Sequence, residues 1–416
     1  MKKSSCMDEH DPDALSVAEA QRRIAAAVQP IGASETVPLH AALGRVLAED
    51  IVSPIDVPPH ANSAMDGYAL RGADLPESGA RDLRVIGTAW AGKPFDGFVH
   101  TGQCVRIMTG ALIPEGADTV VMQEHVRRTD DSARVSAGGK PGQHVRRAGE
   151  DVARGQPVLT AGKRLSPAEL GVLASLGIAE VRVTRRARVA FFTTGDELRT
   201  LGAPLGPGQI YDSNRYTLHG MLSRLGAELI DLGIVRDTRA AVAAAFEEAA
   251  RQADAIVTSG GVSVGDADYV QETLERLGQV NFWKIAMKPG RPLAFGRVGD
   301  AWFFGLPGNP VSVMATFYQF AQPALRRLMG EHVGEPILIK LPTATRLKKA
   351  PGRTEFQRGV VETGAAGQLV VRSTGAQGSG MLSSMSKANC FIILPADSGD
   401  VEAGGLVDVQ LFEGLV

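Results

Sequence analysis

The sequence predicts a multidomain protein built around a central α/β domain with a mainly parallel, doubly wound sheet. Three observations lead to this prediction. From Arg188 onward, short apolar runs alternate with helical patterns, which is typical of a parallel sheet with helices on both faces. Before that point, a glycine- and proline-rich stretch of short strand-like runs lies between two helical patterns. After about Pro336 the chain becomes strand-like again, which indicates a small β-barrel or sandwich.

Length, composition and charge limit the class of protein. A chain of 416 residues is too long for one hydrophobic core, so we expect roughly two to four domains. The net charge of −2 argues against a general nucleic-acid or membrane-surface binder. The amino terminus shows no secretory signal, and no apolar run reaches the roughly 18 residues of a membrane span. The three cysteines have no CxxC spacing, and we therefore expect a cytoplasmic protein.

Two helical patterns have well-marked starts. The first spans Val17 to Val28, and Ser16 with Glu19 forms a capping box in front of it. The second lies within residues 166–177 and begins with a Ser-Pro-Ala-Glu run, which supplies an N-cap, a proline at the first helical position and a capping glutamate. Because these helices flank the β-rich stretch, we expect that stretch to be an insertion into a helical domain.

The β-rich stretch has no long helical period. Its apolar runs are short, as at Leu83–Ile86 and Thr119–Met122, and glycine and proline are frequent between them. We predict that residues 57–149 form the inserted domain. The helical linker domain would then comprise residues 1–56 and 150–187.

The α/β pattern extends over residues 188–331, and residues 332–416 form the predicted C-terminal β domain. In the α/β region, the predicted strands lie at 189–192, 229–235, 255–258, 280–287 and 302–305. The predicted helices lie at 216–225, 240–251, after residue 268, and at 310–328. In the C-terminal domain, the predicted strands lie at 337–341, 369–371, 391–394 and 407–411.

The loop from Thr258 to Tyr269 follows a buried strand and precedes a helix. Its glycines Gly260 and Gly261 let a phosphate approach the backbone, and the helix amino terminus favours an anion. Asp266 and Asp268 follow at a spacing that suits a cation beside that phosphate. We interpret the loop as a nucleotide-phosphate and magnesium site, with a plain tight turn as the alternative.

Two further strand-to-helix junctions are polar and rich in glycine. One is Thr193–Glu197, where two adjacent acids exceed what a helix cap requires. The other is Leu306–Pro310, where Asn309 with Pro310 is explained about equally well by a plain helix start. In an open parallel sheet such loops gather at one edge, where ligands bind.

A lysine pair follows in the run from Trp283 to Pro292. With a period of two, Lys284 and Lys288 would point to the same side of a strand, where two like charges are costly unless an anion neutralises them. A solvated edge strand protected by lysines is the alternative. We favour binding of phosphate or another oxyanion.

The inserted domain carries three polar segments at 62–69, 106–111 and 149–151. Read alone, Asp66-Gly67 is a signal for a type I′ turn. The eight histidines are scattered and none has zinc-ligand spacing, so a structural zinc site is not expected. No GxSxG signature of a nucleophilic serine is present.

Taken together, these motifs resemble the molybdopterin molybdenumtransferase family, which acts in the last step of molybdenum cofactor synthesis. They recur in the family's order over nearly the whole chain. One departure is Ala61, where many members carry an aspartate just before the Asn-Ser pair. The matching stretches are NSAMDGYA, RIMTGALIPEGADTVVMQE, RRAGEDV, TTGDEL, GQIYDSNR, SGGVSVGDADYV, FWKIAMKPGRPLAFG, FGLPGNPVS, FQRG and TGAQGSG.

The resemblance implies four domains, with a molybdopterin-binding central domain and a C-terminal β-barrel. It also implies a homodimer, in which the central domain of one subunit and the inserted domain of the other form each active cleft. The implied reaction takes adenylylated molybdopterin and molybdate with Mg²⁺, and it releases AMP and the molybdenum cofactor. Expected partners are the molybdopterin adenylyltransferase and the molybdoenzymes that accept the cofactor.

The resemblance and the residue chemistry together assign the site. The residues expected to act in catalysis are Asp66, Glu197, Asp268, Lys284 and Lys288. Those expected to bind substrate are Thr109, Asp151, Gly260, Gly261, Ser263, Asp237, Pro307, Pro310, Arg358 and Ser379. The expected ligands of Mg²⁺ are Glu197, Asp266 and Asp268. The dithiolene sulfurs belong to the pterin, so no protein cysteine is needed to hold molybdenum.

Two alternatives stay open. A molybdopterin adenylyltransferase is similar only to the central domain, and the inserted and C-terminal domains argue against it. A dimeric scaffold is the other alternative, since relatives of this family also anchor membrane receptors. An assay with ATP and free molybdopterin would test the first, and partner binding without metal insertion would favour the second.

Overall fold

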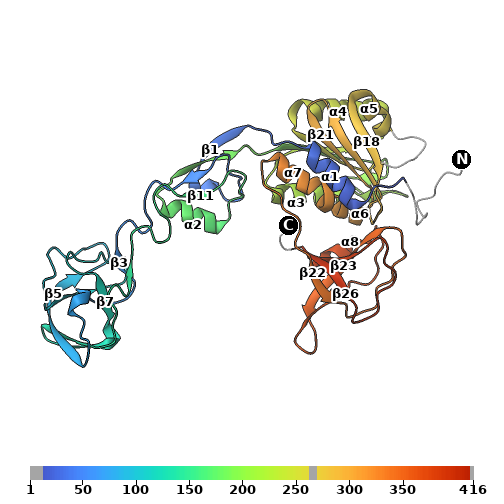
Figure 1. The fold of residues 1–416 in the computed structure, drawn as a ribbon. Helices are drawn as coiled ribbons and strands as arrows, with labels where there is room; N and C mark the ends of the chain where they lie inside the picture. The colour runs from blue at the N-terminus through green and yellow to red at the C-terminus, as the bar shows by residue number, and fades with distance from the viewer. Residues whose placement is uncertain (1–12, 262–268, 413–416) are drawn as a thin grey trace.

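The computed structural model describes residues 13–261 and 269–412. Figure 1 shows four units in an extended arrangement: a β-rich unit lies at one end, a small linker unit connects it to the central α/β unit, and a second β unit lies beside the central one. Ser263, Asp266 and Asp268 lie outside the described residues. Among the described residues, no helix is both long and apolar enough to cross a membrane.

The central sheet has six strands in the order β16-β13-β17-β21-β20-β18. The first four are parallel, and the last two are antiparallel to their neighbours. Apolar residues fill both faces because its inner strands are covered by helices on each side. The strands are β16 (Glu228–Val235), β13 (Arg188–Thr194), β17 (Ala255–Ser259), β21 (Ala301–Leu306), β20 (Pro292–Val298) and β18 (Gly278–Lys284).

Helices cover both faces of this sheet. Along β13, Val189 and Phe191 pack into one core cluster, whereas Ala190 and Phe192 pack into the other, as the alternation of a strand requires. The first cluster contains α1 (Val17–Ala27), α3 (Ser213–Leu225), α6 (Pro310–Thr316), a π-helical turn (Phe317–Ala321) and α7 (Gln322–Leu328). The second contains α4 (Arg239–Gln252) and α5 (Tyr269–Leu277).

The linker unit is small and is built from two strand pairs and one helix. α2 begins with the expected capping box, in which Ser166 and Glu169 satisfy each other's backbone N–H groups. At α1 only half of that box forms, because Ser16 accepts from the Glu19 N–H while the Glu19 carboxylate pairs with Arg23. The elements are β1 (Ser34–Pro38) with β12 (Glu180–Thr184), β2 (Ile51–Val52) with β11 (Pro157–Leu159), a 3-10 turn (Leu39–Ala41) and α2 (Pro167–Ser175).

The inserted unit is a six-stranded sheet in the order β7-β4-β6-β5-β9-β8, with an apolar cluster on each face. Its strands are β4 (Gly67–Leu70), β5 (Ala80–Ala89), β6 (Gln103–Ile107), β7 (Thr119–Met122), β8 (Val126–Thr129) and β9 (Ser132–Ser136). β3 (Asn62–Ser63) pairs with β10 (Val145–Arg146), and 3-10 turns lie at Gly72–Asp74 and Gln123–His125.

The C-terminal unit is a mixed sheet in the order β19-β23-β25-β26-β22, and β24 also pairs with β23. A bridge between Thr343 and Val371 connects the end of β22 to β24. The elements are β19 (Met287–Lys288), β22 (Ile339–Pro342), β23 (Thr354–Thr363), β24 (Leu369–Ser373), α8 (Leu382–Lys387), β25 (Cys390–Leu394) and β26 (Leu406–Leu411). A short pair, β14 (Leu198–Arg199) with β15 (Ile210–Tyr211), lies after β13.

Two local predictions from the sequence are wrong. Lys284 and Lys288 do not share a strand: Lys284 ends β18 of the central sheet, and Lys288 lies in β19 of the C-terminal sheet. Between them the chain leaves the central sheet, and Ile285 forms a bridge with Leu15. Asp66-Gly67 is not a type I′ turn either, because Gly67 has no positive φ and begins β4.

Candidate functional site

Three loops meet at the carboxyl edge of the central sheet, as the sequence predicts. Asn214, in the first turn of α3, donates its amide N–H groups to Ser259 Oγ at 2.9 Å and to Gly308 O at 2.6 Å. Ser259 Oγ in turn donates to Pro307 O at 3.1 Å. One side chain from α3 therefore connects the ends of β17 and β21. Sequence reasoning missed Asn214, although it lies within the GQIYDSNR stretch.

The paired glycines are required by close packing. Gly260 and Gly261 have φ values of 93° and 67°, which other residues rarely adopt. A Cβ on Gly260 would lie 2.7 Å from Thr194 O, and one on Gly261 would lie 2.4 Å from Val270 Cγ2. The turn thus presses the end of β17 against the end of β13. This contact explains the glycines whether or not a phosphate binds there.

Carboxylates gather where β13 and β16 end. The Glu197 carboxylate folds back over Gly195, where a Cβ would lie 2.6 Å from Glu197 Oε2. Burial, followed by the nearby charges of Asp196 and Glu197, raises the pKa of Asp237 above its ordinary value. Asp196, which the sequence prediction left out of the site, therefore belongs to this group. Within the described ranges, no set of three or more acidic, histidine or cysteine side chains is arranged to hold a metal ion.

The predicted cationic residues occupy different environments. The Lys288 ammonium lies 3.1 Å from Oε1 of Glu355, a buried carboxylate on β23, so its nearest anion belongs to the protein. Lys284 is the last residue of β18, an edge strand of the central sheet. This position agrees with the alternative prediction of a lysine on a solvated edge strand. The Arg358 side chain is only 1% exposed. Burial lowers its pKa to about 10, so the guanidinium stays charged at neutral pH.

Arg358 supports the loop that carries Ser379. Its Nε donates to Ser384 Oγ at 3.0 Å, and Nη2 donates to Gly378 O at 3.1 Å. The backbone carbonyl of the neighbouring Ser379 accepts from the backbone N–H of Val311 at 3.0 Å, in the first turn of α6. The structure therefore brings Arg358 and Ser379 to the third loop of the central sheet, which sequence order alone does not show.

The third loop begins α6 as predicted, with Pro310 at the first helical position. Asn309 occupies the N-cap position, but its side chain makes no capping hydrogen bond. The plain helix-start interpretation therefore explains the backbone of Asn309 and leaves its amide group unexplained. Pro307 contributes its carbonyl to the Ser259 hydrogen bond described above.

In the inserted unit, Asp66 and Thr109 form one constellation. Asp66 Oδ1 accepts from Thr109 N at 2.7 Å and from Thr109 Oγ1 at 2.8 Å. These two hydrogen bonds lower the pKa of Asp66, and the one from the Thr109 backbone has the larger effect. Gly67 is needed because a Cβ there would lie 2.1 Å from Val121 O. Asp151 is exposed, and its backbone N–H donates to Val57 O at 3.1 Å, where the chain returns to the linker unit.

The structure does not bring all predicted site residues together within one chain. Asp66 and Thr109 lie in the inserted unit, which Figure 1 shows at the far end of the molecule from the central and C-terminal units. Glu197, Asp237, Gly260 and Pro307 lie at the carboxyl edge of the central sheet. One chain thus presents two separate groups of predicted site residues.

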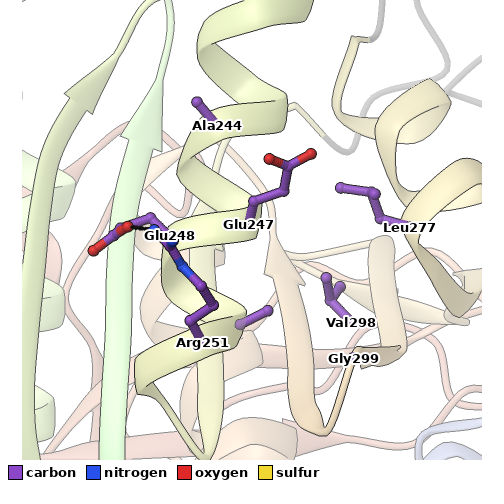
Figure 2. Close-up of a pocket in the computed structure, with 8 residues that line it drawn as sticks. Ala244, Glu247, Glu248, Arg251, Leu277, Val298 and Gly299 are labelled. Carbon is purple, nitrogen blue, oxygen red and sulfur yellow. Dashed lines mark hydrogen bonds and ion pairs between the residues drawn. The ribbon is translucent and has the colours of Figure 1, made fainter.

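Two surface hollows lie away from both groups. One, of about 580 Å³, lies between α4, Leu277 and the β20–β21 turn at the amino-terminal end of the parallel strands. Figure 2 shows Glu248 and Arg251 paired on its rim. The other, of about 1080 Å³, lies between α1, the π-helical turn and the segment before β22. Neither hollow is lined by a predicted site residue.

A doubly wound sheet with glycine turns and carboxylates at the carboxyl ends of its strands is the framework of a ligand-binding α/β protein. Comparison with known families gives the particular class. Residues 15–177 match the MoeA N-terminal region (domain I and II), 190–327 a probable molybdopterin binding domain, and 340–412 the MoeA C-terminal region (domain IV). The chain belongs to the molybdopterin molybdenumtransferase family and is an enzyme of the transferase class.

Individual relatives cover the chain nearly end to end. A molybdopterin molybdenumtransferase from Haemophilus influenzae is 49% identical and covers 92% of this chain and 95% of its own. One from Nostoc is 38% identical over 89% of this chain and 87% of its own. The crystal structure of the molybdopterin biosynthesis moeA protein from Pyrococcus horikoshii OT3 has a TM-score of 0.83 and 31% identity, covering 96% of this chain and 100% of its own.

Proposed function

We propose that this protein inserts molybdate into adenylylated molybdopterin in a Mg²⁺-dependent reaction that releases AMP and the molybdenum cofactor. The observation that carries the proposal is the meeting of three chemistries at one edge of the central sheet. The carboxylates of Glu197 and Asp237 lie there, and so does the Gly260-Gly261 turn. The Arg358-supported loop joins this edge through the first turn of α6.

The carboxylates of Glu197 and Asp237 would supply part of a magnesium site at this edge. Mg²⁺ prefers carboxylate oxygens and keeps several waters, and it rarely occupies a site made wholly of protein ligands. Burial is the main cause of the raised pKa of Asp237, and the charges of Asp196 and Glu197 add to it; a cation would relieve this surplus of negative charge. Glu197 and Asp237 would hold the ion, together with Asp266 and Asp268, which lie outside the described residues. Mg²⁺ would supply charge neutralisation on the phosphate oxygens of the substrate.

The protein groups would have separate tasks in this reaction. The Gly260-Gly261 turn, which has no Cβ atoms, would let the adenylyl phosphate approach the backbone closely. Lys284 and Lys288 would contact the remaining anionic oxygens, and Arg358 would fix the loop that carries Ser379. One water would hydrolyse the phosphoanhydride bond between AMP and the pterin phosphate. Molybdate would bind the two dithiolene sulfurs of the pterin, and one of its oxides would leave as water with the two thiol protons.

The active cleft is proposed to be composite, in a homodimer. Asp66 and Thr109 lie far from the sheet edge of their own chain, so a second subunit would have to supply them. Their surroundings suit an interface, because Met65, Trp90 and Leu112 are 41%, 53% and 40% exposed. The proposal also includes a cytoplasmic location. It includes a barrel-like C-terminal domain as well, and the Thr343–Val371 bridge between the two ends of that sheet supports this shape.

The experiment that tests the function follows AMP release by the purified protein. The substrates are adenylylated molybdopterin and molybdate, with Mg²⁺ present or removed by a chelator. We expect AMP release that requires both molybdate and Mg²⁺. Absence of release under complete conditions would contradict the proposal, and formation of adenylylated product from ATP and free molybdopterin would favour the adenylyltransferase alternative.

A further inference from the structure

Glu355 is a buried carboxylate beneath a half-exposed lysine. Its residue is only 4% exposed, whereas the side chain of Lys288 is 48% exposed. Glu355 Oε1 accepts from Lys288 Nζ at 3.1 Å, and Oε2 accepts from Gln357 Nε2 at 2.9 Å. Both oxygens therefore have partners, and the carboxylate is held from two sides. The ammonium of Lys288 is fixed at its inner side and reaches solvent at its outer side.

Backbone pairing sets the position of this pair. β19 pairs with β23 in parallel, and Lys288 is the register partner of Glu355. Met287, the other residue of β19, is fully buried, and Thr354 N donates to Ala286 O at 2.9 Å. Lys288 thus enters the C-terminal sheet immediately after the chain leaves the central sheet. The side chain that meets it comes from a strand that sequence analysis did not predict.

The charges around Glu355 do not cancel. Burial lowers the pKa of Lys349, and the Glu355 carboxylate opposes that shift, while Lys288 adds to it. The charge of Glu355 likewise opposes the shift that burial causes in Arg358. Asp397 also opposes the shift of Lys349, and Arg353 adds to it, so two carboxylates face four cations, Lys288, Lys349, Arg353 and Arg358. An anionic ligand at the exposed end of Lys288 would meet a positive surplus, even though the lysine already has a carboxylate partner.

We propose that Glu355 is a positioning residue, which holds the ammonium of Lys288 in place for the anionic substrate. This inference rests on the proposed function and extends it to a residue outside the predicted site. A buried carboxylate costs free energy unless it is paired. A lysine held in one orientation loses less conformational freedom when a ligand binds.

A double-mutant cycle in AMP release tests the proposal, using Glu355→Gln, Lys288→Ala and the double variant. We expect Glu355→Gln to lower kcat/KM about tenfold, mainly through a higher KM, in a protein with the wild-type Lys288. In the Lys288→Ala background the same change should have no further effect on kcat/KM. Melting temperatures of all four proteins separate activity from stability.

Glu362→Gln is the matched control, because Glu362 lies on the same strand and pairs with Arg372 at 2.9 Å on the exposed surface. It should leave kcat/KM unchanged. If Glu355→Gln does not fold, Glu355→Asp is the second variant. It keeps the negative charge but places it one methylene farther from Lys288, and it should raise KM in the same way.

Three results would contradict the positioning role. Equal losses from Glu355→Gln in both backgrounds would show a general structural effect. Unchanged activity in a folded Glu355→Gln protein would show that Lys288 needs no such partner, and wild-type activity in Lys288→Ala would remove the lysine from the site. Lack of AMP release by the wild-type protein would instead overturn the proposed function itself, and with it the role of Glu355.

Discussion

Asp237 shows how a candidate site residue can reduce the stability of its own protein. Its raised pKa means that the folded state favours the protonated form, because Asp237 is partly buried beside Asp196 and Glu197. The unfavourable contribution is present above the folded pKa and disappears as pH falls below the ordinary value of 3.8. A cluster of this kind is expected where a cation binds.

We therefore expect Asp237→Asn to raise the melting temperature near neutral pH and to lower the rate of AMP release at limiting Mg²⁺. The stability gain should vanish in acid, where the wild-type carboxyl is also uncharged. Thermal unfolding at several pH values, with Asp231→Asn as a control outside the cluster, checks this. A melting temperature that falls near neutral pH would show that Asp237 is not under repulsion.

Lys284 provides a second test at the residue scale. As the last residue of an edge strand, it can be removed without opening a core. We expect Lys284→Ala to change the free energy of unfolding by about 0.5 kcal/mol or less, and to raise KM for the adenylylated substrate. Steady-state kinetics and urea unfolding measure the two effects. Wild-type KM would support the edge-strand interpretation instead of anion binding.

At the scale of elements, the sequence predicted most helices and central strands because their signals are local. The capping box at Ser166 and Glu169, and the apolar run of β17, depend on a few neighbouring residues. β20 and β23 were missed. β23 contains the buried Glu355, Gln357 and Arg358, and their polar side chains hide its strand pattern.

The sequence could predict only those parts of the candidate site whose position follows from the order of strands and helices along the chain. Parallel strands bring their carboxyl ends to one edge, so the three loops could be expected to meet. The role of Asn214 in joining two of these loops depends on tertiary contacts, and so does the pairing of Lys288 with Glu355. A period of two along one strand could not reveal that the chain changes sheet between Lys284 and Lys288.

The capping box of α2 gives a prediction at this scale. Hydrogen bonds from Ser166 lower the pKa of Glu169 to about 2 from 4.5. The ionised Glu169 therefore stabilises the folded protein fully above pH 4.5, and this stabilisation is lost as the pH falls toward 2. We expect Ser166→Ala to cost about 1 kcal/mol of unfolding free energy at neutral pH and less in acid. Ser175→Ala, at the other end of α2, is the control, and an equal loss at both ends would contradict the cap.

At the scale of the whole molecule, the extended arrangement separates the two groups of predicted site residues. The Asp66–Thr109 pair is held by short hydrogen bonds and a sterically required Gly67, so it is well ordered without any contact to the central sheet. Such preorganisation at the far end of the chain has a use if a second subunit completes the site. The account therefore depends on one cleft being built from two chains.

Complementation between two inactive variants measures this most directly. Asp66→Ala protein is mixed with Glu197→Gln protein, subunit exchange is confirmed by mass, and AMP release is followed. In a heterodimer both changes fall in one composite cleft, so the other cleft is wild type, and activity should return to about half of wild type per heterodimer. A mixture that exchanges subunits and stays inactive would contradict the composite cleft.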